Sequence, residues 1–406
     1  MKKVFLTVIV CLTGVLFYAQ NIQTKKILKD IYQKRIVAIG EDTHGTKEFH
    51  ILRHFISKEL VVNNKFNVII LENPADQMLQ LNDDLMKTDN IDSLMQKHLF
   101  SIYQTKEMKD FLLWIREYNT NNKNKIIVKG CDDSGKIGVK ILKERMEIYE
   151  SNSNLQKQIA ELFDKITLSY SEYCIKKGKV KDNTQAGKMK FYAEIYDWAI
   201  ETEKIISLSK INDDRINELM YQIQTSYLPY KKWSEGKYIS RDEIMAQRVL
   251  YYAKNKDNKL IVLAHNAHIS KKDIIDNEIG LMGKKIQESL PLEYFSLALM
   301  SGTGTYSYIE NKFINNDQVY DDPLLNSAFI ELNKNSWNFF FFSNKKYWNK
   351  YIGMKDLVKC PNDKKKMRLV GYGKEVLDKD YYDVSKLSDL YDGIIFVKNS
   401  RNSTGI

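Results

Sequence analysis

The sequence predicts an α/β fold with a mostly parallel central sheet, because short apolar runs rich in Val and Ile alternate with amphipathic segments. These runs lack the polar alternation of a half-exposed strand, which is typical of strands buried on both faces of a parallel sheet. A long helical stretch separates the third run from the fourth. We therefore expect a sheet flanked by helices, with an inserted helical subdomain over the carboxyl-terminal edge of the strands.

The first strands and helices follow from the spacing of apolar residues. Phe49, Leu52, Ile56 and Leu60 recur at helical spacing and predict a helix over 46–60, and a second amphipathic segment covers 108–118. Strands that alternate with helices imply parallel pairing with right-handed crossovers. The predicted strands are residues 35–40, 66–72, 125–131, 260–265, 294–300 and 393–397.

The chain divides into parts where this alternation stops. Residues 141–255 carry long helical patterns at 155–175, 185–208 and 211–227, and Ser240 with Glu243 forms a capping-box pattern before another helix. We interpret 21–140 as the first part of an α/β catalytic domain, 141–255 as the inserted helical subdomain and 256–406 as the second part. Residues 305–385, rich in Tyr, Asn and Lys, show no clear pattern.

The first twenty residues have the pattern of a signal peptide. Lys2 and Lys3 precede an apolar run over 4–17, and a cleavage point follows near residues 18–20. That run is short for a membrane span, and no later stretch reaches the roughly 20 apolar residues that a span needs. We expect a periplasmic or secreted protein without stable membrane insertion after signal removal, although a retained anchor stays an alternative.

Composition narrows the classes of partner. The formal net charge is +10, but its lysines are spread along the chain among Asp and Glu rather than gathered into a patch with arginines and aromatics. We therefore expect a small-molecule substrate and no nucleic-acid partner. Three scattered cysteines remain after the signal segment, Cys131, Cys174 and Cys360, and we interpret them as small buried side chains.

Ionisable side chains follow four predicted strands, at the point where each strand ends. Because the carboxyl ends of parallel strands meet at one edge of a sheet, where open α/β folds bind ligands, we expect these side chains to lie close together. They are Glu41 and His44 after the first strand, Glu72 after the second, Asp132 after the third, and His265, Asn266 and His268 after the fourth.

Structural roles compete with these functional ones. Asp42 follows a strand and precedes a helix, so we expect it to cap that helix. His50, His54 and His98 lie inside helical stretches and are expected to be structural or exposed. Arg53 flanks an apolar helix face and either pairs with a buried carboxylate or anchors the substrate.

Known catalytic signatures of other hydrolases are absent from the sequence. No Gly-x-Ser-x-Gly elbow, His-Glu-x-x-His motif or phosphate-binding loop occurs. The candidate catalytic residues are therefore His44, Glu72, Glu41, His265 and His268, and the candidates for substrate binding are Arg53, Arg241, Asp132 and Asn266.

Six short blocks follow one another along the chain: Gly40-Glu41-Asp42-Thr43-His44-Gly45 with Arg53, Leu71-Glu72, Trp114 to Asn119, Gly130-Cys131-Asp132, Arg241 to Ala246, and Ala264-His265-Asn266-Ala267-His268 with Met282-Gly283. In this order they resemble the erythromycin esterase family, which also includes succinoglycan-biosynthesis-related relatives. The resemblance spans roughly residues 30–305, with a weaker echo near the last strand.

The resemblance implies ester hydrolysis without a covalent serine. The histidine matching His44 would act as general base on a water, and carboxylates matching Glu41 and Glu72 would orient or assist it. No cofactor is required, and the substrate is an ester or lactone. Opening of a macrolide ring, with antibiotic resistance as its consequence, is the specific candidate.

Two other functions stay open at this stage. Glu41, His44, His265 and His268 could instead hold Zn or Mn in a metal-dependent hydrolase. The fold could also serve as a non-catalytic periplasmic binding protein that keeps the same rim as a polar pocket. Chelation separates the first alternative from a histidine base, and substitution of His44 and Glu72 separates the second.

Overall fold

The computed structural model describes residues 23–133, 136–149, 153–274, 280–310, 312–314, 317–319, 325–375, 379–384 and 386–406. The predicted signal segment lies outside these residues. The chain forms two compact units. The described residues of the first unit fall within 23–72, 81–129 and 249–406, and those of the second fall within 73–80 and 130–248.

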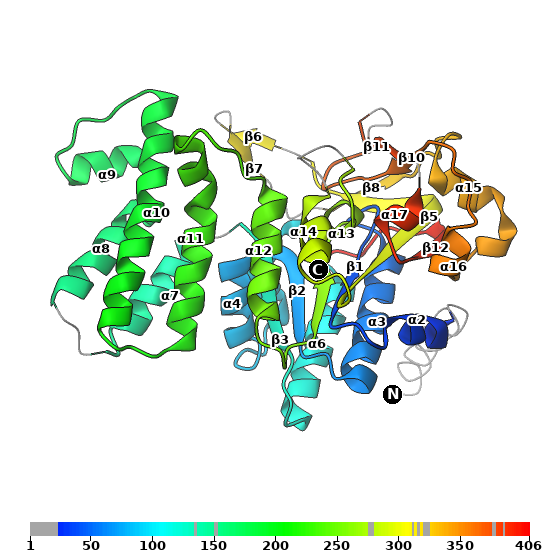
Figure 1. Cartoon of the computed structure of the whole chain (residues 1–406), viewed down its shortest axis with the longest axis horizontal. Helices are drawn as coiled ribbons and strands as arrows, with labels where there is room; N and C mark the ends of the chain where they lie inside the picture. The colour runs from blue at the N-terminus through cyan, green and yellow to red at the C-terminus, as the bar shows by residue number, and fades with distance from the viewer. Residues whose placement is uncertain are drawn as a thin grey trace. The chain divides into compact units, whose positions relative to one another are not determined.

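A mostly parallel sheet organises the first unit (Figure 1). All six strands predicted from the sequence are present in it. They are β1 (Ile36–Ile39), β2 (Val68–Pro74), β3 (Ile127–Asp132), β4 (Leu260–Leu263), β5 (Tyr294–Tyr308) and β12 (Gly393–Ser400). The order is β3-β2-β4-β1-β5-β12-β9, in which β9 (Lys350–Gly353) is antiparallel to β12. β8 (Asn326–Phe329) pairs antiparallel with β5 off this path.

The pairing register aligns the carboxyl ends of the central strands. β1 pairs parallel with β4 from Ile36↔Leu260 to Ile39↔Leu263, and β2 pairs with the other side of β4 through Leu71↔Leu263. Every residue of β1 and β4 is buried, as the continuous apolar runs predict. The carboxyl ends of β1, β2 and β4 therefore lie at the same edge of the sheet.

Helices pack around this sheet. α3 contacts α6, while α13, α14 and α15 contact β5. The bounds are α2 (Thr24–Ile31), α3 (Lys47–Asn64), α4 (Ala75–Asp84), α5 (Ile91–His98), η1 (Ser101–Tyr103), α6 (Lys106–Asn121), α13 (Asn266–Ile269), α14 (Leu281–Ser289), α15 (Trp337–Ser343), η2 (Lys345–Tyr347), α16 (Met354–Leu357) and α17 (Leu387–Leu390). Short strand pairs are β6 (Lys312–Ile314) with β7 (Asp317–Val319), and β10 (Lys365–Arg368) with β11 (Tyr381–Val384).

The second unit is helical, as the sequence predicts for this stretch. Its elements are α7 (Lys136–Met146), α8 (Ser153–Thr167), α9 (Tyr170–Lys176), α10 (Gln185–Leu208) and α11 (Asp214–Ser234), with most of α12 (Arg241–Ala253). α10 packs along α11 and α8, and Figure 1 shows these helices in green. A core that includes Leu162, Ile195 and Leu219 fills the space between them.

Local signals explain where two of these helices begin. The expected helix over 155–175 is split, because Ser169 and Glu172 form a capping box that starts α9. The predicted capping box before α12 is confirmed, since the Glu243 amide donates to the Ser240 hydroxyl at 3.1 Å and the Ser240 amide donates to Glu243 at 3.2 Å.

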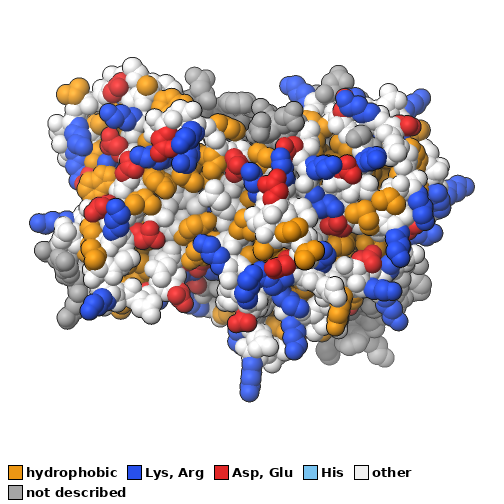
Figure 2. Space-filling model, viewed as in Figure 1, with side chains coloured by type: hydrophobic (Ala, Val, Ile, Leu, Met, Phe, Trp, Pro, Cys, Tyr) orange, Lys and Arg blue, Asp and Glu red, His pale blue; other side chains and the backbone are white. Residues whose placement is uncertain are grey.

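Surface and burial agree with the composition. Cys131, Cys174 and Cys360 are free and buried, as expected. Over the part of the chain that the structure describes, no helix is both long and apolar enough to cross a membrane. On the face drawn in Figure 2, Lys and Arg side chains are mixed with Asp and Glu.

Candidate functional site

The loop after β1 places Glu41 and His44 inside the protein. Glu41 is fully buried and His44 is 2% exposed. The loop starts at Gly40, where an added Cβ would lie 2.1 Å from Oδ1 of Asn266. Only glycine therefore allows this close approach between the ends of β1 and β4.

Glu41 is the centre of a charged hydrogen-bonding group. Its Oε1 lies 3.0 Å from Nδ1 of His44 and forms an ion pair with Nη1 of Arg53 from α3. Burial alone would raise the pKa of the Glu41 carboxyl, but Arg53 and His44 outweigh it and lower the pKa from 4.5 to about 2. Of the two roles predicted for Arg53, the pairing with a buried carboxylate is the one observed.

The end of β2 and the loop after β4 form the other half of the cluster. Oε2 of Glu72 accepts a hydrogen bond from the His265 backbone amide at 2.8 Å, and Oε1 lies 3.1 Å from Nε2 of His268. His265 also caps the short helix α13, because its Nδ1 accepts from the Ala267 amide at 3.3 Å. One carboxylate thus fixes the loop that carries both imidazoles.

The two halves meet through their histidines. The rings of His44 and His265 have centroids 4.9 Å apart, and those of His265 and His268 are 6.4 Å apart. Burial, reinforced by the neighbouring His44, lowers the pKa of His265 to about 3, although Glu72 opposes this shift. His265 is therefore neutral at physiological pH. The ends of three parallel strands bring two acids and three imidazoles together.

Two tyrosines at this cluster were not predicted. The hydroxyl of Tyr103, in η1, lies 3.3 Å from Nδ1 of His44. The ring of Tyr372 stacks on the His44 imidazole at a centroid distance of 4.7 Å and an interplanar angle of 15°. The chain has 25 tyrosines, and nothing in the local sequence distinguishes these two. Burial and the charge of Glu72 raise the pKa of Tyr103 well above its ordinary value, which keeps its hydroxyl protonated.

The remaining histidines are buried, in line with a structural role. His50 and His54 lie on α3, and the ring of His54 stacks on Phe111 at 4.1 Å. Burial lowers the pKa of both histidines, most strongly that of His54. His98 is also buried, with its Nε2 3.9 Å from Asp84.

Three residues predicted to bind substrate have other partners. Asp132 and Arg241 lie in the helical unit, where Nε of Arg241 donates to Oδ1 of Asp132 at 2.7 Å and Nη2 lies 2.5 Å from Oδ2. The side-chain Nδ2 of Asn266 donates to the Leu299 carbonyl at 2.8 Å, and its Oδ1 accepts from the Leu299 backbone amide at 3.3 Å. Asn266 therefore ties the loop after β4 to β5.

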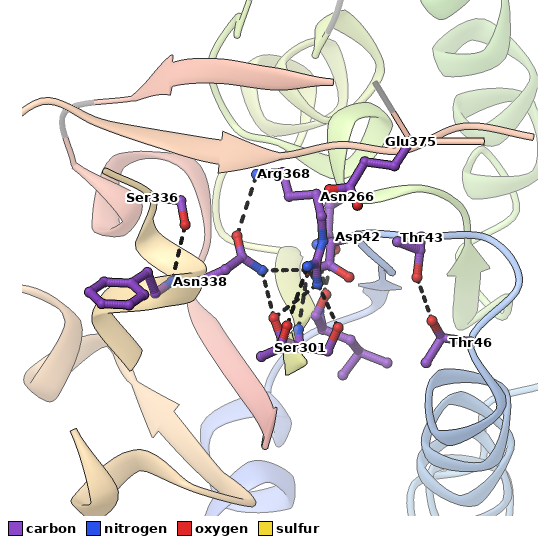
Figure 3. A network of polar contacts seen from close by, with 12 residues as sticks. Asp42, Thr43, Thr46, Asn266, Ser301, Ser336, Asn338, Arg368 and Glu375 are labelled. Atoms are coloured by element: carbon purple, nitrogen blue, oxygen red, sulfur yellow. Dashed lines mark hydrogen bonds and ion pairs between the residues drawn. The ribbon is translucent and has the colours of Figure 1, made fainter. Parts of the chain in front are cut away.

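The prediction that Asp42 caps α3 is wrong. Thr46 occupies the N-cap position, and no side chain there accepts a capping hydrogen bond. Asp42 is instead fully buried and pairs with Arg368, whose Nη2 lies 2.9 Å from Oδ2 of Asp42 (Figure 3). The position of Asp42 is therefore determined by its ion pair with a residue far along the chain, and not by the local preference of an aspartate for a helix cap.

The cluster does not have the geometry of a metal centre. Within the described ranges, no three side chains of His, Cys, Asp or Glu converge closely enough to hold a metal ion. Oε1 of Glu41 is already engaged by a guanidinium, and Nδ1 of His265 accepts a backbone hydrogen bond. Arg53 would also repel a cation placed beside Glu41.

Known proteins match most of the chain. The family profile described as erythromycin esterase matches residues 61–400, a range that includes Glu72, His265 and His268 and begins after His44. Erythromycin esterase type II from Escherichia coli is 26% identical over 324 residues, which cover 71% of this chain and 75% of that protein.

Solved structures share the fold. A crystal structure of a protein from Bacillus cereus has a TM-score of 0.75 at 20% identity and covers 93% of this chain and 92% of its own. An erythromycin esterase variant, solved in its open conformation, has a TM-score of 0.67 at 18% identity and covers 94% of both chains. With a family profile that extends over most of its length, this chain belongs to the erythromycin esterase family and is a hydrolase of that family.

Proposed function

We propose that this protein hydrolyses an ester or lactone by using His44 as a general base that activates a water molecule. The observation that carries the proposal is the contact between the ionised Glu41 carboxylate and Nδ1 of His44 at 3.0 Å. A carboxylate that orients an imidazole and stabilises its protonated form is the arrangement that general-base catalysis requires.

The protonation state of Glu41 defines which nitrogen of His44 can react. An ionised carboxylate can only accept a hydrogen bond, so Nδ1 of His44 must carry the proton. The lone pair of the neutral imidazole is then on Nε2, which has no hydrogen-bond partner among the described residues. Nε2 would take the proton of the attacking water and later return it to the alcohol that leaves.

His265 is suited to stabilise the oxyanion of the tetrahedral intermediate. Its Nδ1 accepts from the Ala267 amide and its pKa is about 3, so the neutral ring carries its proton on Nε2. Nε2 of His265 is buried without a hydrogen-bond partner among the residues described. A buried N–H beside the base, waiting for an acceptor, can bind negative charge that develops on a carbonyl oxygen.

Glu72 would position rather than react. It holds the His265 backbone and pairs with His268, so its negative charge is already used within the loop after β4. Removal of that carboxylate is expected to displace His265 from His44. In this proposal Glu72 and His268 support the oxyanion side of the site, and Glu41 with Arg53 supports the base.

The similarity to erythromycin esterase type II supports an ester of a macrolide as the specific candidate, namely its ring lactone. Opening of such a ring would inactivate the antibiotic and make this protein a resistance enzyme. The site geometry itself requires only a carbonyl that fits between His44 and His265.

The test uses the purified protein with a panel of macrolides and simple esters, followed by mass spectrometry for the addition of water. His44→Gln should lower turnover by about 10²–10⁴-fold, since it removes the general base. Glu72→Gln should also lower turnover, because it removes the carboxylate that holds the His265 backbone amide and pairs with His268. His98→Gln serves as the matched control, because it replaces a buried histidine that contacts Asp84 instead of the cluster.

Two results would oppose the proposal. Full turnover by the His44→Gln variant would exclude a histidine base at this position. Ligand binding without turnover by the unsubstituted protein would favour a binding function instead.

We also propose that the protein is exported. The support is the sequence of residues 1–20, with Lys2 and Lys3 before the apolar run over 4–17. The amino-terminal sequence of the protein recovered outside the cytoplasm should begin soon after residue 20. Recovery of the intact amino terminus from the cytoplasm would contradict export.

A further inference from the structure

The segment over residues 368–372, at the end of β10, runs beside the loop that carries the base. Val370 forms an isolated parallel bridge with Thr43, and its amide donates to the Asp42 carbonyl at 3.0 Å. Two residues later, the carbonyl of Tyr372 accepts a hydrogen bond from the Ile309 amide at 2.8 Å. The backbone on both sides of this segment is therefore attached to the loop after β1 and to the end of β5.

Arg368 anchors the start of this segment in the interior. Figure 3 shows its guanidinium directed at Asp42 and Ser301. Nη2 lies 2.9 Å from Oδ2 of Asp42, 2.9 Å from the Ser301 carbonyl and 2.6 Å from the Ser301 hydroxyl. Asn338 donates to the same oxygen of Asp42 at 2.7 Å. Both charged residues are fully buried, so removal of either would leave the other as a buried charge without its partner.

The segment ends with an aromatic ring on the face of the base. Tyr372 stacks on His44, while Glu41 and Tyr103 contact the Nδ1 edge of the same imidazole. Such a stack restricts rotation of the imidazole about its side-chain torsions. The π face of the Tyr372 ring also attracts the positive charge that develops as the His44 imidazole takes a proton.

We propose that Tyr372 is a positioning residue for His44, and that the buried Asp42–Arg368 pair holds the segment that delivers it. The effect of this positioning on turnover rests on the function proposed above. Stacking between rings contributes to orientation without contact to the reacting atoms. The pair and the tyrosine thus act on the reaction through the imidazole.

The orientation of His44 can be measured without any substrate. The chain contains six histidines, so selective labelling of histidine in the full chain gives a sparse NMR spectrum. Ring protons of His44, assigned with His44→Gln, should lose the ring-current shift of the stack in Tyr372→Leu and keep it in Tyr372→Phe. Arg368→Lys should displace the same signals in the same direction, because lysine has one donor nitrogen in place of Nη2, which reaches Asp42 and Ser301, and Nη1, which reaches the Gly302 carbonyl at 3.4 Å.

Turnover shows whether this orientation matters for the reaction. Tyr372→Leu should lower kcat about tenfold with little change in KM, as expected from the loss of one aromatic stack. Tyr372→Phe should restore most of the rate. As a single substitution, Arg368→Lys should lower kcat. In the double variant with Tyr372→Leu it should lower kcat little further, because both substitutions act through one contact. Tyr382→Leu is the control for a half-buried tyrosine on β11 of the same unit.

The outcomes separate this proposal from the one before it. If the unsubstituted protein hydrolyses none of the esters, the proposed function fails, while the NMR shifts still decide whether Tyr372 orients His44. Unchanged His44 signals in Tyr372→Leu would overturn the positioning role. A rise of kcat/KM in that variant would also overturn it, since the ring would then only cover the base.

Discussion

Glu41 and Glu72 are both buried carboxylates beside imidazoles, but their partners differ. Glu41 shares one oxygen between His44 and Arg53, and this attraction lowers its pKa to about 2 in spite of burial. Glu72 uses its two oxygens for a backbone amide and for His268. The first arrangement keeps a negative charge next to the base, and the second holds a loop in place.

The depressed pKa of Glu41 predicts how stability depends on pH. The unfolded carboxyl titrates near 4.5 and the folded one near 2, so its stabilising contribution is present above pH 4.5 and is lost as pH falls toward 2. The full contribution is about 3 kcal/mol. Chemical denaturation should show that Glu41→Gln is less stable at neutral pH. Its deficit should narrow between pH 4.5 and 2, and a constant deficit over that window would contradict the prediction.

At this scale the sequence predicts some residues and not others. Glu41, His44, Glu72 and His265 were predicted because they follow apolar runs whose strand identity is clear from the sequence. Arg368 could not be predicted, since its partner Asp42 is 326 residues away and no pattern in either segment announces the pair. The place of a single site residue can be predicted where it stands at the end of a strand that the sequence itself reveals.

At the scale of elements, the turn between β1 and α3 determines the position of His44. Gly45 directly follows His44 in this turn. The Gly45 carbonyl accepts hydrogen bonds from the Ser307 amide at 2.8 Å and the Ser403 amide at 2.9 Å. A Cβ at this position would lie 1.9 Å from the Ser307 carbonyl oxygen. The turn can therefore pack against β5 only if this residue has no side chain.

Gly45→Ala should consequently displace the turn. We expect a loss of about 3 kcal/mol in the free energy of unfolding, at the upper end for overpacked sites because the atom in the way is backbone. Turnover should fall as well, since His44 is the preceding residue. Gly371→Ala is the matched control for stability, because nothing lies within 4 Å of its added Cβ. Equal stability of the two variants would show that the turn adapts.

Whole elements were predicted best where their periodicity is uninterrupted. The buried strands and α10 agree with the expected segments, whereas the region over 305–385 contains β8 and β9, which the sequence did not reveal. β8 is only four residues long and alternates between half-buried and exposed positions, and β9 has an exposed first residue. Such short edge strands depend on the sheet that they join, so their own sequence carries little signal.

At the scale of the whole molecule, the parallel sheet explains why distant segments meet. β2, β4 and β1 are neighbours in the sheet although they are separated along the chain, and each ends in residues of the cluster. A second contribution comes from the segment after β10, which the topology does not predict. The sheet thus accounts for the acids and imidazoles, and long-range packing accounts for the tyrosine that stacks on the base.

The same assembly predicts that the reaction needs no metal ion. Glu41 already neutralises Arg53, Nδ1 of His265 accepts from a backbone amide, and His268 is paired with Glu72, so a cation would have to break several existing contacts in order to bind. Extensive dialysis of the purified protein against a chelator should leave kcat/KM unchanged, and added Zn or Mn should not raise it. A zinc hydrolase treated in parallel verifies that the chelation is complete, because a metal-bound hydroxide is lost with its ion. Loss of turnover on chelation with recovery on addition of one divalent ion would replace His44 as the base by a metal-bound water, and the ion's ligands would then have to come from a rearranged cluster.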